Sequence, residues 1–517
     1  MPVAIALAAV AAVPTLSRPA AGPTNVAGIP AAQVGAHGPL SDFLSGPLEL
    51  VGHSDITPPG ATQPLGNNGG IALIGDCAFV GRWHDYSGAN NIQIVNIHDP
   101  ANPTVIGSVP GSAVVDAVAR EIRAIDLPNF KMLTVMTFSK YLDEGLEKAT
   151  QNSFYFWTFP SGNCTKPVFA GKLSTRPFRG HEFYQWLDPV HSVNGHPRII
   201  EYLTTPLSGA DVVVIDASDP AHAKILGLFQ AGLFPVTTTE ENLQSGVPLG
   251  YGKYTHSISL SPDGTRAFIS DWDGGFFTEN TSLIAGAGPV AVMTTQGLAT
   301  LPLTYVKGGV GNTHSSVLVP GTKNTMVVGD EVYVTTDGCP FGWMHVINAG
   351  GLLQKASALS QFALPENTAV DCGSDGLVND RNADGLRLDG TFSMHNQTVT
   401  PHYVITSWYG AGLRVVDITH PTAPHEVAFF VPKPVADISS SPDTPAPVYG
   451  KTASTADDWQ VATWSYPIIR NGLIYVSDMR SGLYILRATP GSALANELNG
   501  IVFLEGNSNL GNLLNAH

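Results

Sequence analysis

One strand–turn–strand unit occurs three times in the chain. Each copy opens on a histidine that begins a short alternating run, and a proline follows six positions later; the histidines are His256, His314 and His395. A second β-rich run comes next and ends in small and acidic residues, as in residues 265–272. Alternating runs separated by turn residues are typical of antiparallel strands. We therefore interpret the three copies as one structural position that the fold repeats.

A second repeated element consists of a strand, a turn with proline, and another strand. Its clear copies lie at residues 94–108, 213–228 and 414–430. Residues 47–52 resemble the second strand of this element without a first strand before them, and the last repeat, residues 472–486, has a weak outer strand. The two incomplete ends predict that the N-terminal strand completes the last sheet, which closes a ring and removes its exposed strand edges.

These repeats predict an all-β protein, a seven-bladed β-propeller over residues 47–490 with its longest insertion at 366–389. A period of about 40 to 80 residues with four strands suits propeller blades better than a solenoid. The 54 glycines and 39 prolines agree with a turn-dense fold. The second blade is weak in sequence, so six or eight blades are the alternatives. The predicted blades are 66–110, 115–173, 178–230, 250–306, 310–364, 390–432 and 458–488 with the strand near 48–55.

The two ends of the chain differ from the repeats. Residues 3–14 form an apolar run that is too short to span a bilayer but suits the core of a signal peptide. We expect a signal peptide over 1–22, although no basic segment precedes the run, and hence a secreted or periplasmic protein. Residues 23–46, rich in alanine, proline and glycine, are expected to form a flexible arm, and 491–517 a C-terminal tail.

Cysteine content and charge limit the compartment and the partners. The four cysteines could form up to two disulfides in an oxidising compartment, and nearness in sequence favours Cys339–Cys372 as the first pair. The formal charge of −16 argues against nucleic acid or an anionic membrane surface as the main partner. We expect no insertion into a membrane.

The strand pair Leu-Arg-Val-Val-Asp-Ile-Thr-His-Pro-Thr-Ala-Pro, at residues 413–424, resembles the LVIVD-repeat family. The resemblance covers most of residues 48–488 and is clear in four blades; it implies a β-propeller that is usually exported. More distantly, histidines at the starts of blades are similar to those of the selenium-binding protein and methanethiol oxidase family, in which such histidines serve a metal.

The repeated histidines predict a metal site at the propeller axis. The first strand of each blade lines the central channel, so imidazoles from successive blades converge at one mouth. His256, His314 and His395 are the predicted ligands, with His181 as the fourth and His191 as its competitor. Neutral imidazoles without carboxylate or thiolate suit a transition metal, copper or iron before zinc. The alternative is that these histidines only hydrogen-bond neighbouring blades.

The remaining blades carry other residues at the aligned position. The second blade has Arg120 or Glu121, the seventh has Ser465 beside Trp464, and the first has only glycines near Gly69. This asymmetry predicts an open side of the channel with room for a small organic substrate.

Candidate catalytic and pocket residues lie next to these positions. Glu182 and Glu121 are candidate acid–base groups, although both could be solvated charges at a mouth. Candidate substrate contacts lie at the ends of the second strands, Trp408, Asp271 and Glu331, and at the aligned position of the seventh blade, Trp464. The alternative role of the residues at the strand ends is turn capping.

One further motif lies in the long insertion. Asp380, Asn382 and Asp384 match the first half of a calcium loop, but Thr391 stands where the closing glutamate belongs. Calcium and a solvated turn both stay open, and either role would be structural.

Two functions from different classes follow. The first is an exported enzyme with a mononuclear copper or iron centre that oxidises a small organic molecule. The second is a non-catalytic propeller that binds a protein, a glycan or a cell surface. Motifs of serine hydrolases, nucleotide-binding folds and zincins are absent from the sequence.

Overall fold

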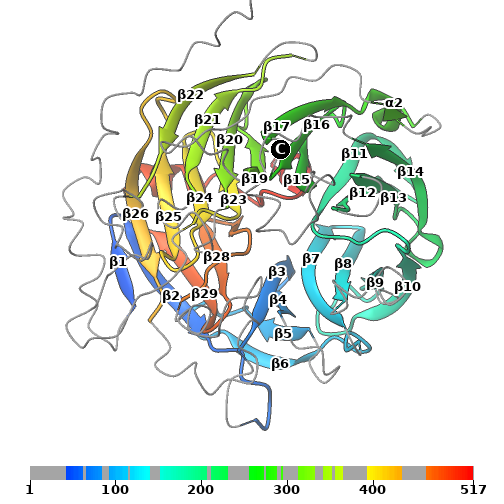
Figure 1. Ribbon diagram of the computed structural model, residues 1–517. Coiled ribbons are helices and arrows are strands. Elements are labelled where there is room, and N and C mark those ends of the chain that lie inside the picture. Colours follow the sequence, from blue (N-terminus) through cyan, green and yellow to red (C-terminus); the bar gives the residue numbers. More distant parts are fainter. Residues whose placement is uncertain are drawn as a thin grey trace, which may run out of the picture.

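The computed structural model arranges seven β-sheets around a central axis (Figure 1). It therefore confirms the predicted seven-bladed β-propeller. The structure describes residues 42–61, 66–83, 92–114, 117–139, 152–206, 211–230, 255–272, 275–287, 293–294, 313–331, 342–351, 356–364, 393–433 and 461–515.

The first four sheets follow one another along the chain. The first contains β3 (Asn68–Ile74), β4 (Cys77–Arg82), β5 (Gln93–Asn96) and β6 (Thr104–Ser108). The second contains β7 (Ala117–Leu127), β8 (Phe130–Ser139), β9 (Ser153–Thr158) and β10 (Val168–Ser174). The third contains β11 (Phe183–Val193), β12 (His196–Thr204), β13 (Val212–Asp216), β14 (Lys224–Gln230) and β18 (Met293–Thr294), with the 3₁₀ helix η2 (Pro220–His222) between β13 and β14. The fourth has, among the described residues, β15 (Thr255–Leu260), β16 (Arg266–Asp271) and β17 (Gly275–Asn280), followed by helix α2 (Ser282–Ala285).

The last three sheets complete the ring. The fifth contains β19 (Thr313–Leu318), β20 (Thr325–Asp330), β21 (Met344–Asn348) and β22 (Ser357–Phe362). The sixth contains β23 (Gln397–Val399), β24 (Tyr403–Ser407), β25 (Leu413–Asp417), β26 (His425–Val431) and β1 (Phe43–Ser45). The seventh contains β27 (Ile468–Arg470), β28 (Leu473–Asp478), β29 (Gly482–Ala488) and β2 (Leu48–Ser54).

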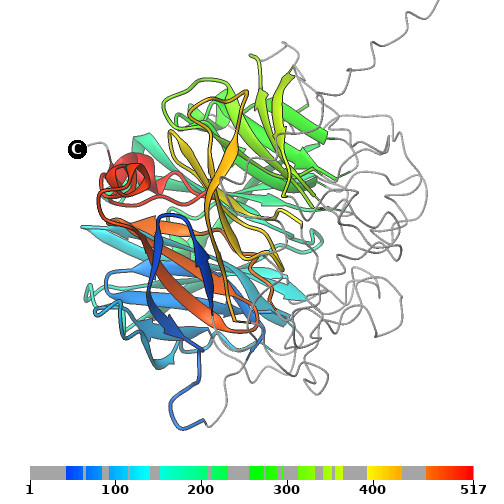
Figure 2. The same cartoon turned by 90° about the vertical axis from the view of Figure 1, so that its left-hand side faces the viewer.

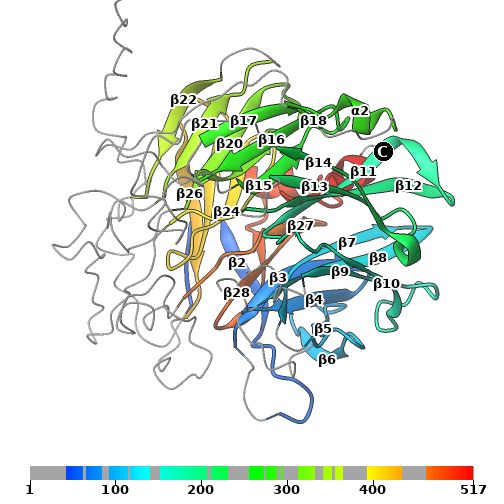
Figure 3. The same ribbon diagram turned by 45° about the vertical axis from the view of Figure 1, so that its right-hand side comes forward.

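Within each blade the first strand lies nearest the axis, as Figure 3 shows for β3, β4, β5 and β6 in sequence from the centre outward. The inner strands β3 and β15 are buried along their whole length, whereas β22 at the rim is largely exposed. An inner strand has a neighbouring blade on each face, so both of its faces bury side chains. The second blade, weakest in sequence, is complete, and β7 and β8 are 11 and 10 residues long.

The N-terminal part of the chain adds two outer strands. β2 pairs antiparallel with β29, with Leu48 opposite Ala488. β1 pairs with β26, with Phe43 opposite Val431, and the Phe43 ring lies 5.2 Å from the ring of Phe429. The strand β1 falls inside residues 23–46, which we expected to be a flexible arm. Packing of the partly buried Phe43 ring against an aromatic partner stabilises this short strand.

The C-terminal segment is folded, where the sequence led us to expect a tail. It contains α3 (Ala493–Leu498) and α4 (Leu510–Leu514), which lie on one face of the ring, drawn in red in Figure 2. Residues 504–509 run inside the ring and touch the inner strands of three blades. Leu504 bridges to Ile469 in β27, Gly506 lies against the carbonyl oxygen of Gln397 in β23, and Ser508 bridges to Gln185 in β11. The segment therefore crosses the channel.

Two carboxyl groups are buried where this segment crosses. Glu201 in β12 accepts hydrogen bonds from Gln185 Nε2 at 2.9 Å and from Thr134 Oγ1 at 3.2 Å, and it is fully buried. Burial raises the pKa of Glu201 to about 8, and it raises the pKa of Glu505 to about 7. Both side chains are therefore partly or largely protonated near neutral pH.

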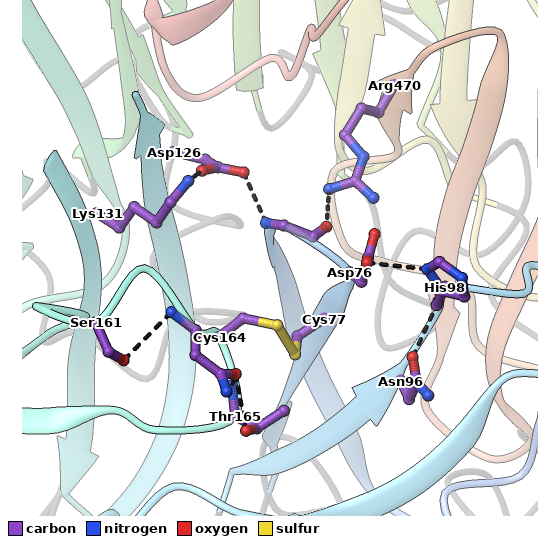
Figure 4. Close-up of a disulfide and its surroundings, with 12 residues drawn as sticks. Asp76, Cys77, Asn96, His98, Asp126, Lys131, Ser161, Cys164, Thr165 and Arg470 are labelled. Carbon is purple, nitrogen blue, oxygen red and sulfur yellow. Dashed lines mark hydrogen bonds and ion pairs between the residues drawn. A yellow bond between two sulfur atoms is a disulfide. The ribbon is translucent and has the colours of Figure 1, made fainter. Parts of the chain in front are cut away.

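A disulfide joins the first two blades (Figure 4). Cys77 begins β4 and Cys164 follows β9, 87 residues later. The turn before Cys77 is also held from both sides: the N–H of Gly75 donates to Asp126 Oδ2 at 2.7 Å, and Arg470 donates to the Gly75 carbonyl at 2.6 Å. Cys339 and Cys372, expected as the first pair, lie outside the described residues.

No helix in the described part of the chain is long and apolar enough to cross a lipid bilayer.

We expect the double substitution Cys77→Ala and Cys164→Ala to lower the free energy of unfolding by about 2–4 kcal/mol, because the bridge closes a long loop of the unfolded chain. Denaturant unfolding of the two proteins under oxidising conditions measures the difference. An unchanged transition midpoint would contradict a stabilising role for this bridge.

The protonated state of Glu201 predicts a pH dependence of stability. Its pKa is about 8 in the folded protein and near 4.5 in the unfolded chain, so the folded protein binds more protons between these values. Stability should fall as pH rises through this window, by at most about 1.4 kcal/mol per pH unit for each such carboxyl group. Urea unfolding at several pH values in this window measures the free energy of unfolding. This free energy should fall less steeply with pH in Glu201→Gln than in the wild-type protein.

The matched control is Glu49→Gln, the same substitution at a solvent-accessible ion pair with Arg487. An equal fall of stability with pH in Glu201→Gln and the wild-type protein would mean that Glu201 is ionised when folded.

Candidate metal centre

The repeated histidine position is a β-bulge at the start of the inner strand. In β15 the pairing with β16 shifts between Thr255 and Ser257, and His256 is the extra residue. In β19 the shift falls between Thr313 and Ser315, which makes His314 the extra residue. A bulge leaves one residue unpaired and re-aims its side chain. The spacing read from the sequence therefore corresponds to a local backbone distortion that directs an imidazole away from the regular ladder.

The third and sixth blades carry the same distortion just before their inner strands. The carbonyl of Thr204 accepts from the N–H of His181 at 2.9 Å, and the N–H of Thr204 donates to the carbonyl of Glu182 at 2.9 Å. Thr204 thus pairs with two consecutive residues, as in a bulge. Ser407 faces His395 and Asn396 in the same way, at 3.0 and 2.9 Å. All four predicted histidines thus occupy one structural position in four consecutive blades.

The four imidazoles form a continuous row. His181 Nε2 lies 2.8 Å from His256 Nε2, the rings of His256 and His314 are 3.8 Å apart, and those of His314 and His395 are 4.0 Å apart. All four side chains are buried. Of the two alternatives for the fourth position, His181 joins the row. His191 lies far along β11, half exposed, where its Nδ1 is 2.8 Å from Asp188 Oδ2.

Glu331, which directly follows β20, places a carboxylate among three of these histidines. Its Oε2 lies 3.4 Å from His256 Nε2 and 3.6 Å from His314 Nε2, and its Oε1 lies 3.3 Å from His395 Nε2. Metal–ligand bonds of about 2.1 Å at tetrahedral angles would separate two ligand atoms by roughly 3.4 Å. The spacing therefore fits a cation between these groups. We had expected Glu331 in a substrate pocket and a site without carboxylate.

Glu182 approaches the row from the other side. Its Oε1 lies 3.8 Å from His314 Nε2 and 4.0 Å from His256 Nδ1. Among the described residues two groups have potential ligand atoms within 4.8 Å of one another: Glu182 with His256 and His314, and Glu331 with His314 and His395. His314 belongs to both groups. It is fully buried, and in the part of the chain that the structure describes neither ring nitrogen has a hydrogen-bond partner.

Burial keeps three of the four imidazoles, those of His181, His256 and His314, neutral. Burial, followed by the charges of His256 and Arg120, lowers the pKa of His181 well below its usual value. Burial likewise lowers the pKa of His256 to about 4 and that of His314 well below the usual range. Neutral imidazole is the form that binds a metal.

The two carboxyl groups differ in charge. Burial, followed by the nearby charge of Glu121, raises the pKa of Glu182 to about 8. Burial opposes ionisation of Glu331 as well, but His314 and His395 lower the pKa of that group well below its usual range. One carboxyl group therefore carries a negative charge among the histidines while the other holds a proton.

Glu121 lies outside the row, although it is buried in the channel. Its Oε2 is 3.0 Å from Arg123 Nη2. The buried Asp271 accepts from Thr255 Oγ1 at 3.1 Å.

The two tryptophans that we expected in a pocket lie in different places. Trp464 contacts the row, because its carbonyl lies 2.6 Å from His395 Nδ1. Trp408 is fully buried and packs against Phe362 in the core between two blades. The candidate calcium residues Asp380, Asn382 and Asp384 lie outside the described residues.

Two tyrosines were not found by sequence reasoning. The hydroxyl of Tyr409 donates to Glu331 Oε1, and the hydroxyl of Tyr466 lies 3.5 Å from Glu182 Oε2. Tyr409 follows β24 at the same end as the histidines, but tyrosine does not recur there in other blades. Only the three-dimensional arrangement links these residues to the carboxyl groups.

Comparison with known proteins finds distant similarities to solved structures. Among solved structures with matching folds, Sqt1 of Chaetomium thermophilum is 12% identical with a TM-score of 0.41, and the match covers 85% of this chain and 86% of that chain. The β-propeller domain of Cps50 (Swd1) of Myceliophteria thermophila is 10% identical with a TM-score of 0.44, covering 83% and 99%. These similarities are too weak to support any statement about function. No curated protein sequence matches the chain.

The family model named LVIVD repeat matches residues 65–110. These residues contain β3, β4, β5 and β6, which together form the first blade. The distant similarity to selenium-binding protein propellers stays a prediction. The protein is therefore a seven-bladed β-propeller whose first blade matches the LVIVD-repeat family model.

Proposed function

We propose that this propeller is a metal-dependent enzyme that holds one transition-metal ion at its axis and oxidises a small organic molecule. The observation that carries the proposal is the position of His314. Its imidazole is fully buried and belongs to two possible ligand groups, and neither ring nitrogen has a hydrogen-bond partner among the described residues. Leaving a buried polar group unsatisfied costs about 1–3 kcal/mol. A metal ion bound to one nitrogen would account for this arrangement.

The donors favour a first-row transition metal. His256, His314, His395 and Glu331 would supply three neutral imidazoles and one carboxylate. Imidazole suits copper, iron, nickel and zinc, whereas calcium and magnesium take oxygen ligands. We propose iron or copper, with iron favoured because a carboxylate joins the imidazoles. When bound, such an ion supplies redox chemistry and polarises a substrate atom.

The surrounding side chains would position the ligands and hold a proton. The hydroxyl of Tyr409 donates to Glu331 Oε1 and so orients the carboxylate. The carbonyl of Trp464 accepts from His395 Nδ1, which leaves Nε2 of that ring directed at Glu331. Glu182, protonated by its raised pKa, can donate a proton at its carboxyl oxygen, which lies 3.8 Å from His314 Nε2.

We also propose that the protein is exported to an oxidising compartment. The disulfide between Cys77 and Cys164 supports this location, because such bridges are rare in reducing cytosol. The competing function is a propeller that binds a protein, a glycan or a cell surface without catalysis. It requires no metal, so metal content separates the two.

We expect protein purified without a chelating tag to contain about one equivalent of iron or copper per chain, measured by plasma mass spectrometry. His314→Ala should reduce the metal content at least tenfold, because His314 belongs to both ligand groups. His191→Ala is the matched control and should keep the metal, since this side chain lies outside the row. Circular dichroism checks that both variants fold.

Absence of metal from the wild-type protein, even after anaerobic reconstitution with Fe(II) or Cu(I), would overturn the enzyme proposal in favour of the binding propeller. Equal metal content in the wild-type protein and His314→Ala would overturn the ligand assignment.

A second prediction concerns the residue that orients Glu331. Tyr409→Phe removes the hydroxyl donated to the carboxylate and should weaken metal affinity by about 10- to 100-fold, the usual effect of losing such a supporting hydrogen bond. Competition with a metal-binding dye measures the affinity. Tyr403→Phe, on the preceding strand β24, should leave it unchanged.

A further inference from the structure

Arg120 occupies the histidine position of the second blade. The pairing of β7 with β8 shifts between Ala119 and Glu121, so Arg120 is the extra residue of a bulge. This is the same distortion that directs His256 and His314 into the channel. The ring therefore presents a guanidinium to the axis in a blade that lacks an imidazole there.

Aromatic rings surround this guanidinium. Its central carbon lies 3.5 Å from the ring centre of Trp83, 5.1 Å from that of Phe138 and 5.3 Å from that of Trp464. Cation–π contacts of this kind hold a flat cation in one plane. Arg120 is 7% exposed, so its position is both rigid and almost completely shielded from water.

One buried donor of Arg120 is unused. Among the described residues its Nε has no hydrogen-bond partner. Among the described residues the acidic group within ion-pair distance is Glu121, whose Oε1 lies 3.9 Å from Nε, and the other oxygen of Glu121 binds Arg123 at 3.0 Å. Burying a hydrogen-bond donor without an acceptor costs free energy, and the cost is largest for a charged group. A guanidinium kept in this state is prepared for an anion that is not part of the chain.

The same aromatic rings connect Arg120 with the histidine row. The ring of Phe138 lies 6.2 Å from that of His181, and the ring of Trp464 lies 5.6 Å from that of His395. A molecule bound to Arg120 would therefore have apolar walls on the way to the metal ligands. Its charged end and its reacting end would lie on opposite sides of these rings.

We propose that Arg120 binds the carboxylate of the substrate, which makes the substrate class small monocarboxylic acids with an apolar or aromatic body. A guanidinium matches the planar geometry of a carboxylate with two parallel hydrogen bonds. One cation balances one negative charge, and the carboxyl group of Glu121, whose Oε1 lies 3.9 Å from Arg120 Nε, disfavours a dianion such as a phosphate ester. This inference rests on the proposed metal centre, because the centre defines where the reacting end of the molecule lies.

The test measures anion binding and metal content separately. The metal-loaded full-length protein is titrated by calorimetry with acetate, benzoate and phenylacetate, each against its neutral amide. We expect at least one acid to bind and its amide not to bind. Arg120→Met should weaken that binding by about 10- to 100-fold, the effect of losing a charge-assisted pair of hydrogen bonds. Arg120→Lys, which keeps the charge without the planar fork, should give an intermediate loss.

The matched control is Arg480→Met. Arg480 is also 7% exposed, but its Nη1 lies 3.3 Å from Asn67 Oδ1. This variant should bind the acid as the wild-type protein does, and all variants should keep the metal.

The outcomes separate the two proposals. Failure of all three acids to bind, or binding that survives Arg120→Met, overturns the carboxylate site while the metal centre stands. Binding that depends on Arg120 in a protein that takes no metal supports the anion site and overturns the proposed oxidation.

Discussion

The bulge at the start of the inner strands is the constraint on which the candidate site depends. In a regular ladder, side chains alternate between the two faces of the sheet, and both faces of an inner strand pack against neighbouring blades. One extra residue breaks this alternation and points a side chain out of the packed layers. The ring repeats the break in the second to sixth blades, so that Arg120, His181, His256, His314 and His395 leave the core and face one another.

Burial then determines the chemistry of these groups. Imidazoles removed from water lose their proton, and isolated carboxyl groups gain one, as Glu182 and Glu201 show. Glu331 is the exception, because three histidines surround its carboxylate. The channel thus contains neutral nitrogen donors beside one ionised oxygen donor. The C-terminal segment crosses the channel and places Glu505 there, which extends the buried polar interior away from the histidines.

Recurring features could be predicted from the sequence, and single features could not. The histidine spacing predicted one structural position. For the second blade the alignment left Arg120 and Glu121 open, and the bulge assigns the position to Arg120. Glu331 was predicted to lie in a substrate pocket, because the sequence shows only that it follows a strand and does not show which residues of other blades lie beside it. The segment 491–517 has no repeat to align with, so it resembled a tail. Nearness in sequence favoured Cys339–Cys372, whereas the described bridge joins Cys77 to Cys164 in adjacent blades.

The sequence by itself predicted the propeller fold and three of the histidines, His256, His314 and His395, because each depends on a local pattern that recurs at a regular interval. The structure decided that there are seven blades and that His181 rather than His191 joins the row. Only the tertiary structure decided which groups meet across the axis. Glu331 and Tyr409 come from different blades, and their contact depends on how the blades are arranged around the ring rather than on any spacing along the chain. The aromatic surroundings of Arg120 arise in the same way, since Trp83 and Trp464 lie at opposite ends of the sequence and become neighbours where the first and last blades meet. Closing a ring brings distant residues together, and this is why the chemistry of its centre could not be derived from order along the chain.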